Sequence, residues 1–147
     1  MPERRTLERA REDAREGKSP STQAGEFVRE EMDHIREGKH GARSSKQAIA
    51  IGLSKARRAG VKLPPPEGPA SLRKKAERDE KAGKHPHRKV SKKRSRAVEG
   101  ALKREPRSSA SHRSLSRQAK TAARKRGKRS LSAAAKKAAR TRKSRSS

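Results

Sequence analysis

Few residues in this chain are of the types that perform chemistry. Its five histidines are His34, His40, His85, His87 and His112, and it contains no cysteine. The His-Pro-His stretch at 85–87 has the spacing of a pair of metal ligands. Without cysteines or clustered acids to complete a ligand set, the pattern favours a solvated basic linker, and we expect no bound metal or cofactor.

The acidic residues do not form a recognisable catalytic arrangement either. Glu30, Glu31 and Asp33 stand beside His34, but general acid–base catalysis needs a pocket that so apolar-poor a chain is not expected to enclose. The tripeptide at 17–19, Gly-Lys-Ser, matches only the end of a phosphate-binding loop and lacks the upstream glycine and the preceding apolar strand. The sequence therefore predicts that the protein is not an enzyme.

The remaining chemistry is electrostatic. The chain has 44 Lys and Arg against 16 Asp and Glu, a formal net charge of +28. Residues 1–37 are slightly acidic in balance, residues 38–105 are basic, and residues 106–147 hold 15 cations and no acid. Cations at this density repel one another unless a polyanion neutralises them, so the C-terminal block indicates binding to nucleic acid.

The cationic block contains an internal repeat. RSLSRQAKTAARKRG (113–127) and RSLSAAAKKAARTRK (129–143) share ten of fifteen residues, and a degenerate copy begins near Ser95. At helical spacing the basic residues of each copy form a stripe beside alanines, which let a helix approach a charged surface. The predicted phosphate contacts are Arg117, Lys120, Arg124, Lys125, Arg126, Lys128, Arg129, Lys136, Lys137, Arg140, Arg142 and Lys143.

The elements that would carry these residues are helical. The fold class expected is mainly α with extensive disorder: a small helical hairpin or three-helix module followed by a disordered basic tail with transient helices. The module is expected over residues 1–63, with helices near 3–16, 22–37 and 45–59, since Ser44 and Gln47 fit a capping box and Gly38 and Gly60 are helix stops. Its predicted core consists of Phe27, Val28, Met32, Ile35, Ile49 and Leu53.

Beyond the module the chain has little to bury. Only 27% of the residues are apolar and 41% are charged, which is too little apolar surface to offset the entropy of ordering most of the chain. We expect a Pro-rich and basic linker over 64–94 and a tail over 95–147 that is disordered or transiently helical and gains helix on nucleic acid.

One segment resembles a known family. The stretch EFVREEMDHIREGKHGARSSKQAIAIGLSKARRAG resembles an uncharacterised bacterial family of small basic proteins, a domain of unknown function whose signature is close to SRKQAIAIALSEARKAG. The similarity is strongest over residues 24–60. The resemblance implies a bacterial source and a helical segment in front of a basic extension, and no activity. Gly52 stands where the family has Ala.

These observations favour a non-specific DNA-binding protein, similar in tail composition to linker histones. Double-stranded DNA is the expected partner, bound through phosphates, with a cytoplasmic, nucleoid location, and the module is available for self-association or a protein contact. The alternatives are an RNA- or ribosome-associated assembly factor and a stress-related hydrophilic protein. The longest apolar run, Ala48–Leu53, is too short for a membrane span, so no integral membrane association is expected.

Overall fold

The computed structural model describes residues 2–85 and 89–146. Pro86, His87 and Arg88, which include two of the three residues of the His-Pro-His stretch, lie outside the described residues. The chain divides into two compact units, one ending at Ser111 and the other beginning at His112.

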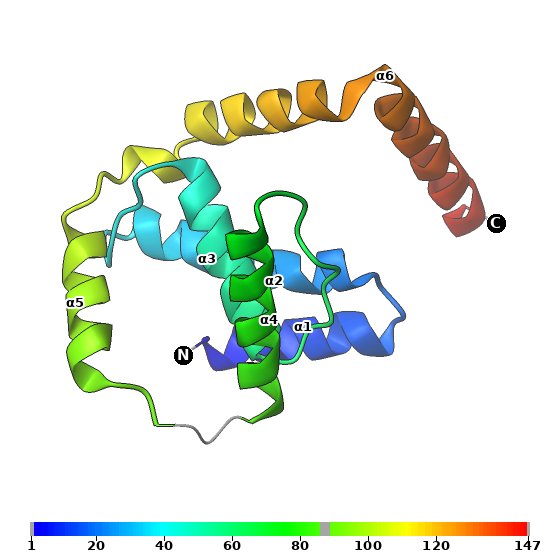
Figure 1. Ribbon diagram of the computed structural model, residues 1–147. Coiled ribbons are helices and arrows are strands. Elements are labelled where there is room, and N and C mark those ends of the chain that lie inside the picture. The colour runs from blue at the N-terminus through cyan, green and yellow to red at the C-terminus, as the bar shows by residue number, and fades with distance from the viewer. Residues whose placement is uncertain (1, 86–88, 147) are drawn as a thin grey trace. The chain divides into compact units, whose positions relative to one another are not determined.

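The first unit is built on three helices, α1 (Arg4–Arg15), α2 (Pro20–Arg36) and α3 (Ser45–Arg58). Their starting points follow from local chemistry. The hydroxyl of Ser19 accepts a hydrogen bond from the Thr22 amide, and that of Ser44 accepts one from the Gln47 amide, as N-capping residues do. Helix α2 packs against both α1 and α3 (Figure 1).

The core between these helices is small. Phe27 is fully buried among Ala10, Ala24, Ala56 and Val61, with Leu7, Leu53 and Leu63 packed at its edge. Helices α2 and α3 approach closely where Gly52 faces the backbone of Val28. The small side chains of α3 permit this approach, so a core with a single aromatic ring can still be closely packed.

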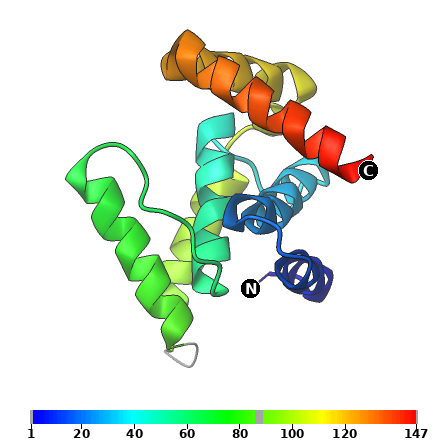
Figure 2. The same ribbon diagram turned by 90° about the vertical axis from the view of Figure 1, so that its right-hand side faces the viewer.

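A fourth helix, α4 (Ala70–Lys84), packs against α3 and lies beside it in Figure 2. Its contact is largely polar. Asp79 is buried and accepts hydrogen bonds from Ser54 Oγ at 2.7 Å and from Arg58 Nε at 2.8 Å. A charge-assisted pair of this kind holds α4 in place without a large apolar face.

Helix α5 (Lys92–Lys103) has no buried residue, but the chain that follows it returns to the core. The 3-10 turn η1 (Ser108–Ala110) packs on α2 and α3. Ser45 donates to the Ser109 carbonyl, Arg36 Nε donates to the Ala110 carbonyl at 3.1 Å, and Arg107 donates to the carbonyls of Ile35 and Arg36. The two bonds from Arg107 reach carbonyl groups in the last turn of α2, where a helix runs out of its own amide donors.

The expectation of extensive disorder is wrong. Helices cover 75% of the chain, and both the expected linker and the expected tail are largely helical. The error has a physical cause. Residues 64–111 have few apolar side chains, but Asp79 and Arg107 hold this segment in place through hydrogen bonds. The tail is helical for another reason, since Ala, Lys and Arg have high intrinsic helix propensity.

The observed units also divide the chain differently from the expected boundaries. Helix α4 and the turn η1 belong to the first unit, which reaches Ser111 rather than residue 63. Within the described residues, no helix is long and apolar enough to cross a membrane.

Candidate nucleic-acid interface

The second unit consists of one helical element, α6 (His112–Arg145), which is interrupted at Gly127. Gly127 has φ 77° and ψ 169°, a backbone conformation that only glycine adopts readily. The ribbon bends sharply at this point (Figure 1). The break falls between the two sequence repeats, so each repeat forms a helical segment of its own.

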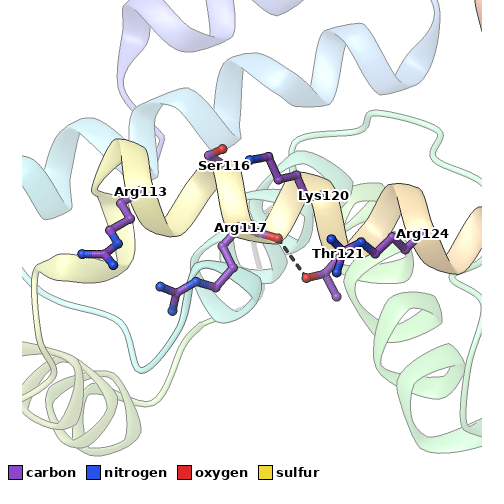
Figure 3. Close-up of a pocket in the computed structure, with 6 residues that line it drawn as sticks. All are labelled: Arg113, Ser116, Arg117, Lys120, Thr121 and Arg124. Carbon is purple, nitrogen blue, oxygen red and sulfur yellow. Dashed lines mark hydrogen bonds between the residues drawn. The ribbon is translucent and has the colours of Figure 1, made fainter.

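The first segment carries one row of basic side chains. Arg113, Arg117, Lys120 and Arg124 recur every three or four residues, which places them along one side of a helix over about 16 Å of its length. They line a shallow hollow together with Ser116 and Thr121. Figure 3 shows Arg113 and Arg117 extending in parallel, with Ser116 and Lys120 toward the opposite edge of the helix.

The second segment repeats this row. Arg129, Lys136 and Arg140 follow Arg113, Lys120 and Arg124 at a constant offset of sixteen residues, and Lys143 extends the row. We name these two rows the basic stripes: Arg113, Arg117, Lys120 and Arg124 in the first, and Arg129, Lys136, Arg140 and Lys143 in the second. Three cations of each stripe correspond, whereas Ala133 stands in the second repeat at the position of Arg117, so the two segments can meet a periodic surface with similar but not identical contacts.

Hydroxyl groups on α6 are turned inward to the helix. Thr121 Oγ1 donates to the Arg117 carbonyl at 2.9 Å, as drawn in Figure 3, and Thr141 Oγ1 donates to the Lys137 carbonyl at 3.1 Å. Each threonine thus hydrogen-bonds one turn back along its own helix. The groups that α6 presents outward are therefore mainly the cations.

The charged Lys, Arg, Asp and Glu side chains of the second unit are all of one sign. It holds 14 of the chain's 44 Lys and Arg residues and none of its 16 Asp and Glu residues. The sequence supplies no carboxylate side chain to neutralise these cations within the unit. Such an arrangement attracts a polyanion and repels another cationic surface.

All twelve predicted phosphate contacts are exposed in the structure. Seven of them lie on the basic stripes, and Lys125, Arg126 and Lys128 surround the break at Gly127. The sequence reasoning omitted Arg113, although it opens the first repeat and corresponds to Arg129 in the second. Aligning the two repeats residue by residue is the signal that finds it.

The predicted core residues differ in how deeply they are buried. Phe27, Met32 and Ile35 are buried, whereas Val28, Ile49 and Leu53 are partly buried. Since Phe27 is the only aromatic residue of the chain and is fully buried, the protein has no aromatic side chain available to stack on a base.

Comparisons with known proteins give limited information. No curated protein and no solved structure matches the chain. The expected resemblance to an uncharacterised family is confirmed for the segment that includes α2 and α3, and the matched residues end before α4 and α6. Residues 15–67 match a family of unknown function (DUF6496).

Proposed function

We propose that the protein binds double-stranded DNA without sequence preference, through the phosphates, by means of the basic stripes of α6. The observation that supports this most strongly is the pair of exposed basic stripes in a unit that contains no acidic side chain. Phosphate contacts supply most of the affinity of non-specific DNA binding.

The helical state of α6 changes the expected mode of binding. We do not propose that the tail folds on nucleic acid, since it is already helical. Preformed helices lose less conformational entropy on binding than a disordered tail would. The cations of each stripe are arranged before the ligand arrives.

The structure supports phosphate binding better than base reading. Specific recognition requires a few side chains placed at base edges by a rigid element. Here cations occupy several sides of α6, and residues near Gly127 carry charge all around the break. For the bacterial source that the family resemblance implies, the corresponding role would be compaction or protection of the nucleoid.

Structured RNA is the second candidate ligand. A stripe that contacts phosphates does not by itself distinguish an RNA helix from a DNA helix. The burial of Phe27 disfavours recognition of single strands by stacking, which RNA-binding modules with exposed aromatic residues use. An RNA- or ribosome-associated role therefore concerns folded RNA.

A salt titration of the full-length protein tests the proposal. Engagement of all eight stripe cations predicts a slope of about −7 for log K against log salt with duplex DNA. A slope flatter than about −3 contradicts stripe-driven binding. A preference of tenfold or more for an RNA hairpin of matched length, about 1.4 kcal/mol, makes RNA the leading ligand.

A matched pair of variants locates the binding surface. The stripe variant R113Q/R117Q/K120Q/R124Q and the control K74Q/K75Q/K92Q/K93Q remove the same number of exposed charges, the control from α4 and α5. Glutamine retains good helix propensity. The stripe variant is expected to flatten the slope by about 3 to 4 and to weaken binding at least tenfold, with a much smaller effect in the control. Equal losses in both variants would show that total charge, and not the stripe, determines binding.

A further inference from the structure

Helix α2 buries two carboxylates that its neighbours do not fully satisfy. The side chain of Glu31 is completely buried and that of Glu30 is 3% exposed. Within the described residues, Oε2 of each has no hydrogen-bond partner. Buried polar atoms are nearly always paired, because removing a carboxylate oxygen from water is costly. This pair therefore requires an explanation.

The environment of Glu31 suggests one. Its Oε1 is paired with the ammonium of Lys55, which leaves Oε2 facing His40. Nε2 of His40 lies 3.1 Å from this oxygen, but the contact lacks the geometry of a hydrogen bond. Nδ1 of His40 lies 2.9 Å from the Gly41 carbonyl, which can only accept, so Nδ1 carries the hydrogen. In the neutral ring, the lone pair of Nε2 is then directed at a carboxylate oxygen.

His34 completes the cluster from the next turn of α2. Its Nε2 lies 2.9 Å from Glu3 Oε1, within hydrogen-bond distance. When Nε2–H donates to this carboxylate oxygen, Nδ1 of His34 is the nitrogen with a lone pair. Histidines that ligate metals commonly donate their other N–H to a carboxylate or a backbone carbonyl, as His34 and His40 do here.

We propose that Glu31, His34 and His40 bind one divalent transition metal ion of the zinc class. Each residue offers one donor atom, and these atoms all lie within 4.8 Å of one another. Tetrahedral zinc with bonds of about 2.0–2.1 Å separates two donors by about 3.3 Å, close to the observed distance between Glu31 and His40. Two imidazoles and a carboxylate form a donor set that zinc accepts, with its fourth position filled by water or another oxygen.

Charge balance supports the same assignment. Glu3, Glu30 and Glu31 bring three carboxylates to the cluster, against Lys55 and the more distant Lys39, 3.6 Å from Glu3. A second donor group, made of Glu3, Glu30 and His34, overlaps the first at His34. A dication would offset the excess negative charge, and the Glu31 group, which has the fully buried carboxylate, is the better site.

The ion would fix the turn between α2 and α3, because its three ligands lie within ten residues of one another. Glu31 and His34 belong to α2, whereas His40 belongs to the turn before α3. The amide of the adjacent Gly41 donates to the Leu102 carbonyl at 2.8 Å, at the end of α5. The metal would thus stabilise the turn against which the chain packs after α5. This role does not depend on the binding of nucleic acid.

Zinc titration of the metal-free full chain tests the site. The background H85Q/H87Q/H112Q removes every histidine outside the cluster, and the chain has no cysteine to compete. In this background, calorimetry is expected to show one Zn²⁺ per chain with micromolar affinity or better, together with a rise in Tm. Cobalt(II) at one equivalent is expected to give the visible absorption bands of a tetrahedral nitrogen and oxygen site.

Variants decide whether the cluster is responsible. H40Q and H34Q are expected to weaken zinc binding at least tenfold, whereas E26Q, a control on α2 outside the cluster, leaves the affinity unchanged. Circular dichroism checks that each variant remains folded, since Glu31 also pairs with Lys55. Absence of zinc binding in the background overturns the proposal, as does binding that H40Q leaves intact. Imidazole rings that NMR shows to remain doubly protonated at neutral pH with one equivalent of zinc also overturn it.

Discussion

The close approach of α3 to α2 gives a sharp prediction, which concerns Gly52 on α3. A methyl group at this position would lie 2.7 Å from Val28 Cα, 2.9 Å from Val28 Cγ2 and 3.0 Å from the Val28 nitrogen. Two of these three atoms belong to the backbone of α2 and cannot rotate away. The substitution G52A therefore forces the helices apart.

Two effects of opposite sign determine the result. Alanine is favoured over glycine in a helix by about 1 kcal/mol, whereas overpacking a close-packed core costs about 1–3 kcal/mol. Gly25 on α2 isolates the first effect, because a methyl group there meets nothing within 4 Å. G25A is expected to stabilise the protein by up to about 1 kcal/mol. G52A is expected to be less stable than G25A by about 1–3 kcal/mol.

Thermal and urea unfolding of the full-length protein measure this difference. For a unit of this size, 1 kcal/mol corresponds to roughly 4 °C, so Tm of G52A is expected to lie about 4–12 °C below that of G25A. Adding V28A should restore little of the loss, because the nearest atom is the Cα. A G52A variant as stable as G25A, or full rescue by V28A, would refute the close backbone approach.

Three further predictions follow from contacts outside the small apolar core. R58A leaves the buried Asp79 with Ser54 as its remaining hydrogen-bond donor. We expect it to weaken the packing of α4 on α3 by about 1–2 kcal/mol, which amide hydrogen exchange in α4 would show as faster exchange. The same loss in the control K62A would contradict a specific role of the Arg58–Asp79 pair. R107A removes the hydrogen bonds to Ile35 and Arg36 and is expected to speed amide exchange over 105–111, whereas unchanged exchange there would show that this side chain does not hold the segment. G127A replaces a residue with φ 77°, which costs alanine about 1–2 kcal/mol, and is expected to join both segments of α6 into one helix. Spin labels at S116C and S144C would then be separated by about 42 Å along the axis in G127A and by less in the native chain, and equal distances would contradict the predicted straightening.

The local features of the chain were predictable because they depend on neighbouring residues. Ser44 marks the start of α3 because an N-capping hydroxyl acts on an amide three residues away. Phe27 and Ile35 fall on one face of α2 by helical periodicity alone. The basic stripes are likewise visible as spacing, since they require only that α6 be helical.

Order beyond residue 63 was not predictable from composition. A count of apolar residues does not include the stabilisation from a buried aspartate that accepts two hydrogen bonds. Nor does it include the stabilisation from an arginine that donates to carbonyl groups at a helix end. Asp79 pairs with Ser54 and Arg58, more than twenty residues away, and Arg107 bonds to carbonyls more than seventy residues away. Periodicity reports relations over three or four residues and contains no information on such pairs.

The sequence by itself determined the helical character of the N-terminal segment, the capped start of α3 and the segregation of charge into a C-terminal unit, because these are properties of composition and short spacing. The tertiary structure decided which carboxylates are buried, that Glu31, His34 and His40 meet, and that the chain after α5 returns to α2. The reason is that burial and proximity depend on how helices pack. A glycine at position 52 is required only because the backbone of Val28 lies directly opposite it.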